Sequence, residues 1–399
     1  MQHLPDYVHE PQALAGQTIH CSCGLTHTIH TQKIVLAPGA IHQSLESGLS
    51  GKPLIIADTH TWAYAPASFH SLPHYILSHD PILADEYTLG DLLIEASGQS
   101  VDYLIALGSG TIGDSVRFLA STLHKPFVNI CTAPSMDGAA SQHSPLIHHQ
   151  FKTTYPAAAP YAIYFDLDIM AAAPAPMLAA GLADIEGKHV ATLDWYIGHL
   201  VTGEAYCGPI RDLTMASVAL CEQYCAGLAA REPQAVRALA TSLLLTSLAM
   251  QLNVTSRPAS GMEHLISHAW ENYAIRQGLS PHLHGDKVGL GTLIACDVYH
   301  AFFHTVKMPQ QERYAPLVRH WNELTEKADA LYALKPLIRE RIAKAGGPVT
   351  LSALGISRQA AVYGFQHMTD GRPRVTIAHL IKELQLEEVI YPSVLESIL

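Results

Sequence analysis

Five short apolar segments within residues 31–170 constrain the fold more than any other feature of this chain. Each is rich in β-branched or aromatic residues, and most are bounded by Gly, Pro, Asp or Ser. Continuous apolar runs separated by crossover segments are typical of parallel strands buried on both faces. The segments are Lys33–Leu36, Leu54–Ala57, Tyr103–Leu107, Phe127–Ile130 and Ala162–Phe165. We therefore expect an α/β domain that binds ligands at the carboxyl ends of its strands.

The character of the chain changes after Asp168. Residues 171–183 are rich in Ala and Pro, and strand signals become scarce. Residues 236–252 and 317–344 have a helical composition. Pro336 is expected to interrupt the second stretch, because proline cannot donate an intrahelical hydrogen bond. We expect this part of the chain to be α-helical.

Length and composition favour two folded domains. The chain has 399 residues, too many for one ordinary core, and contains 48% apolar and 15% charged residues. We predict an α/β domain at residues 1–168 and an α-helical domain at residues 169–399. The functional site is expected in the cleft between them.

Charge and cysteine content argue against several classes of function. The net charge of -11 is unsuited to a nucleic-acid surface. No apolar run is expected to be long enough to cross a bilayer, so we expect no membrane insertion. Residues 1–6 lack the basic and apolar features of an export signal, and seven cysteines without a regular framework fit a reducing compartment. We expect a cytoplasmic protein.

A glycine-rich turn follows the third apolar segment. Gly108, Gly110 and Gly113 match the spacing GxGxxG, and residues 111–122 have a helical pattern. Glycines let the backbone approach a pyrophosphate, and a helix N-terminus adds N–H donors. The next strand ends at Thr132 without the carboxylate that commonly binds a ribose. A strand–turn–helix junction without a ligand would also need glycine, and this alternative stays open.

A second loop, residues 132–141, contains hydroxyl side chains, a proline, an aspartate and a glycine directly after a strand. Its position favours contact with a nucleotide, whereas helix capping by Ser135 or Asp137 is the simpler alternative. Asp58 ends the second apolar segment. It would suit an adenosine ribose, although a strand-terminal aspartate without a ligand is equally compatible.

One carboxylate and several histidines have spacings that suit a metal site. Asp184 and Lys188 are four residues apart, on one face of a helix. An aspartate with two histidines gives three protein ligands and leaves positions for water or substrate. Because the chain has 25 histidines, sequence alone does not choose between neighbours. The candidates are His264 or His268, and His282 or His284.

Together these motifs resemble the sn-glycerol-1-phosphate dehydrogenases, in the superfamily of glycerol dehydrogenase, dehydroquinate synthase and iron-containing alcohol dehydrogenase. They occur in the family's order and cover most of residues 30–300. The matching segments are residues 108–114 (GSGTIGD), 132–138 (TAPSMDG), 183–188 (ADIEGK), 257–264 (RPASGMEH) and 284–289 (HGDKVG). The resemblance implies a dehydroquinate synthase-like fold: an N-terminal Rossmann-like parallel-sheet domain, then an all-helical C-terminal domain.

The resemblance implies a ligand set and a nucleotide site. Asp184, His264 and His284 would bind one divalent metal, zinc in most of the family or nickel in bacterial relatives. Lys188 stands where iron-dependent alcohol dehydrogenases have a further histidine. The residues implied for NAD(H) or NADP(H) are Asp58, Gly108, Gly110, Thr111, Asp114, Thr132, Ser135, Asp137 and Ser141, with Asp137 and Ser141 near the substrate.

The implied reaction interconverts dihydroxyacetone phosphate and sn-glycerol 1-phosphate. The metal would stabilise the developing alkoxide, and His268 or water would deliver the proton. The substrate is a small phosphorylated triose, and its phosphate needs positive charge. The candidate cations are those beside the motifs: Lys188, Arg257 and Lys287.

Three other functions remain open at this stage. A glycerol dehydrogenase acting on the unphosphorylated polyol would use the same ligands. A dehydroquinate-synthase-like cyclase would also bind NAD and metal, with no net change in NADH. A non-catalytic binding protein is the third. The family favours a homodimer, although no interface is visible in the sequence.

The two ends of the chain look like the bacterial AraM-type branch. Cys21, Cys23 and His27 occur close together near the N-terminus, and the C-terminal extension is long. We expect the N-terminal segment to form a flexible hairpin. A second metal site on these three side chains is the alternative.

Overall fold

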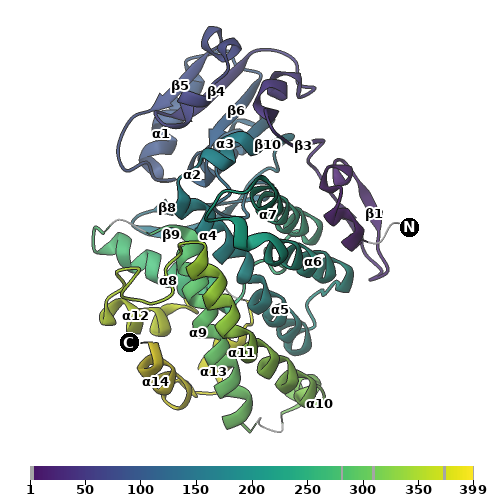
Figure 1. Ribbon diagram of the computed structural model, residues 1–399, viewed down its shortest axis with the longest axis vertical. Coiled ribbons are helices and arrows are strands. Elements are labelled where there is room, and N and C mark those ends of the chain that lie inside the picture. The colour runs from purple at the N-terminus through teal and green to yellow at the C-terminus, as the bar shows by residue number, and fades with distance from the viewer. Residues whose placement is uncertain (1–3, 280–281, 308–310, 372–373, 399) are drawn as a thin grey trace.

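The structure is a computed structural model that describes residues 4–279, 282–307, 311–371 and 374–398 (Figure 1). Three residues of the N-terminal segment considered above, Met1, Gln2 and His3, lie outside the described residues. The strands are β1 Thr18–His20, β2 Thr26–Thr28, β3 Lys33–Ala37, β4 Pro53–Asp58, β5 His74–Leu77, β6 Tyr103–Gly108, β7 Phe127–Cys131, β8 His143–His148, β9 Phe151–Pro156 and β10 Ala162–Asp166.

Helices make up most of the remaining chain. The α-helices are α1 Glu86–Ser97, α2 Gly110–Leu123, α3 Leu167–Ala172, α4 Ala175–Glu186, α5 Lys188–Thr202, α6 Gly208–Tyr224, α7 Pro233–Asn253, α8 Met262–Arg276, α9 His284–Thr305, α10 Ala315–Arg319, α11 Trp321–Lys344, α12 Arg358–His367, α13 Ile377–Glu383 and α14 Glu387–Ile398. The short 3₁₀ helices are η1 Leu4–Val8, η2 Pro11–Leu14, η3 Ala40–Glu46, η4 Thr61–Tyr64, η5 Ala67–Ser71, η6 Cys225–Gly227 and η7 Glu312–Tyr314.

A six-stranded parallel sheet has the order β3-β10-β7-β6-β4-β5. All five predicted strands are confirmed, as β3, β4, β6, β7 and β10. The sequence reasoning missed β5, which lies at the sheet edge and is only partly buried. Its four residues, HYIL, begin with an exposed histidine and include only one buried side chain, so they give no continuous buried apolar run.

Side chains of the central strands alternate between two apolar layers. Ile105 packs on the layer that contains Ile41 and Ile169, whereas Leu104 packs on the layer that contains Val116. Helices α1 and α2 therefore cover one face, and η3 and α3 cover the other. The centre of the sheet is buried on both sides, which explains why β4, β6, β7 and β10 are mostly apolar.

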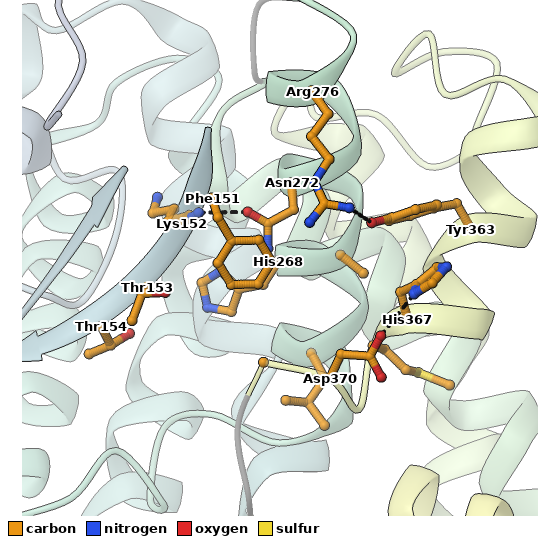
Figure 2. A pocket seen from close by; sticks show the side chains of 14 residues that line it. Phe151, Lys152, Thr153, Thr154, His268, Asn272, Arg276, Tyr363, His367 and Asp370 are labelled. Atoms are coloured by element: carbon orange, nitrogen blue, oxygen red, sulfur yellow. Dashed lines mark hydrogen bonds and ion pairs between the residues drawn. The ribbon is translucent and has the colours of Figure 1, made fainter. Parts of the chain in front are cut away.

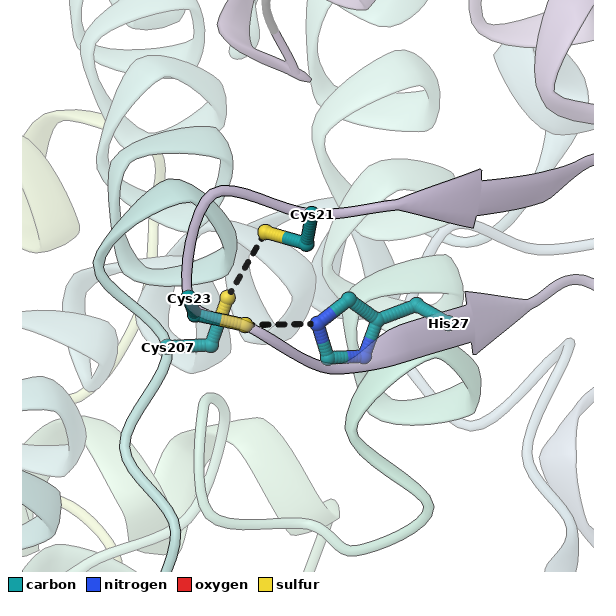
Figure 3. Close-up of side chains that lie close together, drawn as sticks. All are labelled: Cys21, Cys23, His27 and Cys207. Carbon is teal, nitrogen blue, oxygen red and sulfur yellow. Dashed lines mark hydrogen bonds between the residues drawn. The ribbon is translucent and has the colours of Figure 1, made fainter.

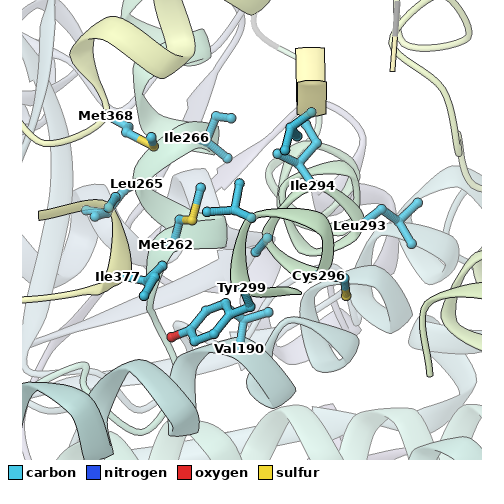
Figure 4. Close-up of a cluster of buried hydrophobic side chains, with 14 of the residues drawn as sticks. Val190, Met262, Leu265, Ile266, Leu293, Ile294, Cys296, Tyr299, Met368 and Ile377 are labelled. Carbon is cyan, nitrogen blue, oxygen red and sulfur yellow. The ribbon is translucent and has the colours of Figure 1, made fainter. Parts of the chain in front are cut away.

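The chain after β10 is helical, and its largest apolar core involves α5, α8, α9 and the C-terminal helices (Figures 1 and 4). Figure 4 shows Val190, Met262 and Tyr299 within this cluster. The fold class is therefore confirmed: a parallel α/β sheet followed by a largely helical part.

One expectation for the helical part is wrong. Pro336 does not interrupt the helix, since α11 continues from Trp321 to Lys344 with the proline inside it. Leu331, Ile338 and Ile342 are buried on either side of the proline. Packing of this apolar face offsets the one backbone hydrogen bond that proline removes.

Helix α7 also differs from expectation. By length and composition alone its 21 residues could cross a membrane, although the sequence analysis expected no such run. Its apolar window is 89% buried inside the protein. The helix is therefore apolar on all sides because it runs through the protein core.

The N-terminal segment packs mainly against the helices, in a cluster that also includes Ile34 and Leu36 of β3. Leu4, Tyr7, Leu14 and Ile29 belong to an apolar cluster formed mainly by α4, α6 and α7. Figure 1 shows this segment beside α6 and α7. The domain boundary at residue 168 stays a prediction, and these contacts cross it.

Two glycines allow helix α4 to pack closely against the loop after β7 and against the start of α9. A Cβ atom on Gly181 would overlap the Pro134 carbonyl oxygen, and one on Gly285 would overlap the Ala180 carbonyl oxygen. These contacts bring α4 against the loop after β7 and the start of α9 against α4. Asp184 and His284 are thereby held near each other.

Gly285→Ala should force α9 away from α4. We expect a loss of about 1–3 kcal/mol in the free energy of unfolding, as for other overpacked sites. Denaturant unfolding of the variant and the wild type measures the difference. Gly90→Ala is the matched control, because a Cβ at this helical position meets nothing within 4 Å. Equal stabilities of Gly285→Ala and wild type would contradict the proposed close approach.

Candidate functional site

A cleft of about 600 Å³ lies between the carboxyl edge of the sheet and the helices. Its sheet side contains Ser109, Gly110 and Thr111 of the glycine turn. Its helical side contains His264 and His284. The nucleotide motif and the metal motif therefore open into the same space.

The three predicted metal ligands form one cluster at the bottom of this cleft. Asp184 on α4, His264 on α8 and His284 at the start of α9 offer ligand atoms that all lie within 4.8 Å of one another. The His264 and His284 ring centroids are 5.1 Å apart. One carboxylate and two imidazoles suit a divalent transition metal with open coordination positions.

Neighbouring groups fix the orientation of His264. The Glu263 carboxylate accepts the Gly261 backbone N–H at 2.7 Å and lies 2.6 Å from His264 Nδ1. The Nδ1 side of the ring is therefore held by Glu263, and Nε2 faces Asp184 Oδ1 at 3.5 Å, where hydrogen bonds to the two carboxylates outweigh the effect of burial and raise the pKa of His264. The geometry therefore offers Nε2 to an ion.

Lys188 links the second loop to the ligand cluster. Its Nζ lies 2.6 Å from Asp184 Oδ1 and 2.8 Å from Asp137 Oδ2, and its side chain is fully buried. The Asp137 backbone N–H also donates to Asp184 Oδ2 at 3.0 Å. Lys188 thus lies between two buried carboxylates that come from opposite walls of the cleft, and burial together with Asp184 still raises the pKa of Asp137.

These contacts set the protonation states. Burial opposes ionisation of Asp184, but Lys188 and His264 outweigh it and hold its pKa well below the usual range. Burial opposes the charge of Lys188 as well, yet Asp137 and Asp184 raise its pKa. Burial, together with His264 and His268, keeps the pKa of His284 well below its ordinary value despite Asp184. A neutral imidazole at His284 has a lone pair available for a metal.

Sequence reasoning missed the groups that hold the second loop. The buried Arg117 guanidinium pairs with Asp114 and donates to the Gly138 carbonyl at 2.6 Å. Gln251 of α7 donates to the Ala140 carbonyl at 2.6 Å. An arginine inside a helix and a glutamine inside another give no sequence signal of this shared role.

The predicted nucleotide residues fall into two groups. Those that line the cleft are Gly110, Thr111, Asp114, Ser135, Asp137 and Ser141. Gly108 lines a narrower adjoining pocket, and the Thr132 backbone N–H donates to the Gly108 carbonyl at 3.1 Å. Asp58 is not among the cleft-lining residues described, and its Oδ1 accepts the His60 and Thr61 backbone N–H groups.

The three predicted phosphate-binding cations are committed to other partners. Lys188 holds the two carboxylates described above. The Arg257 guanidinium binds Glu204 and the Val375 carbonyl, and Lys287 Nζ binds the His282 carbonyl and Glu271. None of these three belongs to the described lining of the cleft. Their role in phosphate binding therefore stays a prediction, and the structure directs all three side chains to other groups.

Two other cations line the cleft among the described residues, Lys152 of β9 and Arg374. Lys152 Nζ lies 3.0 Å from Glu271 Oε1, and Arg374 donates to Ser256 Oγ at 2.8 Å. The aromatic and β-branched residues within 151–155 could have indicated β9, but nothing in them indicates the cleft. His268, the predicted proton donor, also lines the cleft, with its ring centroid 5.7 Å from that of His284.

A side pocket of about 130 Å³ adjoins the cleft (Figure 2). It shares Lys152 and His268 with the cleft and extends toward α12. Figure 2 shows the Lys152 backbone N–H donating to Asn272, and Arg276 donating to the Tyr363 hydroxyl. The first bond fixes β9 against α8 and so sets the position of Lys152, and the second joins α8 to α12.

Known proteins resemble this chain in sequence and in fold. The family model for iron-containing alcohol dehydrogenase matches residues 40–174. A glycerol-1-phosphate dehydrogenase of Halalkalibacterium halodurans is 32% identical over 91% of this chain and 95% of that relative. One of Bacillus subtilis is 34% identical over 76% of this chain and 75% of that relative.

The chain belongs to the glycerol-1-phosphate dehydrogenase family. A probable glycerol dehydrogenase of Sinorhizobium meliloti has the same fold, with a TM-score of 0.64, 17% identity, and 92% of this chain and 97% of that one covered. The fold and the motif order of the family are therefore both present.

Asp194 binds the start of α8, the helix that carries His264, so its titration tests the hydrogen bonds that support the metal ligands. It accepts the Met262 backbone N–H at the start of α8 and the Tyr299 hydroxyl. Burial and the Glu263 carboxylate raise the pKa of Asp194 to about 6. The unfolded chain titrates near pH 4, so the folded state binds this proton more tightly. The resulting stabilisation is present below about pH 4 and is lost as the pH rises through about 6.

Asp194→Asn removes this titration. Between pH 4 and a pH above 6, the wild type should lose about 3 kcal/mol of unfolding free energy relative to the variant. This loss corresponds to a shift of about two pKa units in the wild type. Urea unfolding at several pH values measures it. A difference that does not change with pH would contradict the raised pKa.

Proposed function

We propose that this chain is a metal-dependent, NAD(P)H-linked sn-glycerol-1-phosphate dehydrogenase, interconverting dihydroxyacetone phosphate and sn-glycerol 1-phosphate. The observation that supports this most is the shared cleft, into which the glycine turn after β6 and the Asp184, His264 and His284 cluster both open. The relatives named glycerol-1-phosphate dehydrogenase support the substrate and the use of NAD(P).

The nucleotide would lie along the carboxyl edge of the sheet. Gly110 and Thr111, at the N-terminus of α2, suit the pyrophosphate, because the free backbone N–H groups there favour anions. Ser135 and Ser141 of the second loop line the same cleft, toward the histidines. We keep Asp58 and Thr132 as candidates for the more distant part of the nucleotide.

Reduction adds a hydride to C2 of the ketone and a proton to its oxygen. The reduced nicotinamide supplies the hydride, and a divalent ion held by Asp184, His264 and His284 would act as a Lewis acid at the oxygen. We propose zinc or nickel, since both accept imidazole and carboxylate ligands. His268 or water delivers the proton, and His268 Nδ1 lies 3.6 Å from Glu271 Oε2.

The substrate phosphate needs positive charge close to the ligand cluster. We assign this role to Lys152 and Arg374, which line the cleft, in place of the three cations first considered. Ser256 and Ser260 also line it, and each accepts a hydrogen bond from Arg374. Arg374 is thereby fixed in position to meet a phosphate.

We further propose that the enzyme is a cytoplasmic homodimer that does not insert into membranes. Light scattering after gel filtration tests the dimer, and separation of soluble and membrane fractions tests the location.

The direct test is NADH and NADPH oxidation followed by absorbance on metal-stripped and then zinc- or nickel-reloaded protein. We expect metal-dependent turnover with dihydroxyacetone phosphate and far less with dihydroxyacetone. Equal turnover of the free ketone would move the assignment to glycerol dehydrogenase. Binding of nucleotide and metal without turnover of either ketone would favour the cyclase or a non-catalytic protein.

Lys152→Gln should raise the KM for dihydroxyacetone phosphate roughly 30-fold, the equivalent of about 2 kcal/mol for one charge-assisted contact. The KM for NADH should change little. Glu271 keeps Lys287 at 3.3 Å, so the variant leaves no unpaired buried carboxylate. Lys344→Gln, on the exposed surface of α11, is the matched control. Unchanged KM values in Lys152→Gln would exclude Lys152 from phosphate binding.

A further inference from the structure

A second cluster of metal-ligating side chains lies outside the cleft. Cys21, Cys23, His27 and Cys207 offer ligand atoms that all lie within 4.8 Å of one another (Figure 3). The first three come from the β1–β2 hairpin. Cys207 precedes α6 and is 186 residues from Cys21 in the sequence. The fold therefore adds Cys207 to the three candidate ligands that lie close together in the sequence.

The distances fit four ligands around one ion. Cys21 Sγ lies 3.6 Å from Cys207 Sγ, and Cys23 Sγ lies 3.3 Å from His27 Nε2. Tetrahedral zinc with its usual bond lengths separates two sulfurs by about 3.8 Å and a sulfur from a nitrogen by about 3.5 Å. A disulfide would need sulfurs about 2 Å apart, so the arrangement matches coordination better than a covalent bond.

His27 is oriented as a ligand. Its Nδ1 lies 2.8 Å from the Leu252 carbonyl oxygen at the end of α7. Nδ1 therefore carries the hydrogen and donates it, which leaves the Nε2 lone pair directed at the sulfurs. His27 is 5% exposed and Cys207 is 1% exposed, so protein surrounds much of the cluster.

We propose that Cys21, Cys23, His27 and Cys207 bind one structural Zn²⁺ ion. Three thiolates and an imidazole are ligands that select zinc, and four protein ligands leave no open position for substrate. The site is separate from the Asp184 cluster, which contains no sulfur. It goes beyond the dehydrogenase function and does not depend on it.

The ion would fasten a segment that cannot be stable alone. Strands β1 and β2 have three residues each, and an isolated hairpin of this size does not hold its structure in water. The ligands join the hairpin to the start of α6 and, through Leu252, to the end of α7. Next to Leu252, Gln251 binds both the His30 backbone N–H and the Ala140 carbonyl of the cleft loop. Metal at this site therefore supports the wall of the cleft from outside.

Cobalt substitution of the full-length protein distinguishes the two sites. We expect Co²⁺-loaded wild type to show an intense sulfur-to-cobalt charge-transfer band, which oxygen and nitrogen ligands alone do not give. Cys23→Ser and Cys207→Ser should each weaken the band and bind one zinc fewer per chain. Cys225→Ser, a buried cysteine outside the cluster, is the matched control and should keep both.

A second measurement avoids variants that fail to fold. A mercurial reagent added to unaltered, reduced protein should release one zinc per chain as it modifies the cysteines, detected with a chromogenic chelator. Absence of both the charge-transfer band and thiol-dependent zinc release would overturn the proposal. A Cys21–Cys207 disulfide found by mass spectrometry in protein purified under reducing conditions would overturn it too.

Discussion

The buried ammonium group of Lys188 is the interaction on which the cleft depends. It lies between Asp137, from the loop after β7, and Asp184, from α4, and so joins the sheet to the helices at the site itself. Two buried carboxylates this close would repel each other strongly, and removing the shared cation would leave them without compensation. The same contacts keep Asp184 ionised, which a metal ligand requires. Lys188 therefore contributes both to the positioning of the cleft walls and to the ionisation of the ligand Asp184.

Sequence patterns predicted the strands that contain a continuous apolar run, including β3 at one edge of the sheet. The four central strands β10, β7, β6 and β4 are buried along almost their whole length, because both faces of the sheet are covered. The edge strand β5 and the hairpin β8–β9 are polar on one side, so their patterns resemble loops. The prediction that Pro336 interrupts its helix was wrong, because the packing of Ile338 and Ile342 outweighs the local effect of proline. Strong tertiary packing can override the intrinsic helix propensity of a single residue.

Site residues that belong to a sequence motif could be predicted, whereas residues that reach the site only through the tertiary fold could not. Asp184, His264 and His284 came from the motifs, and the structure brings them together. The sequence did not indicate the partners of the predicted phosphate-binding cations: Arg257 lies next to a motif but pairs with Glu204. Lys152 reaches the cleft only because β9 packs on α8, a contact between segments about 120 residues apart. No spacing rule contains that information, and the same holds for Cys207 beside the N-terminal cysteines.

The most direct test of this account is a double-mutant cycle on the free energy of unfolding, with Lys188→Met, Asp137→Asn and the double variant. Residues in direct ionic contact couple by about 0.5–3 kcal/mol, and burial places this pair toward the upper end. We predict that Asp137→Asn costs clearly less stability when Lys188 is already absent. Strictly additive effects, with a coupling free energy near zero, would contradict the claim that Lys188 joins the two walls of the cleft.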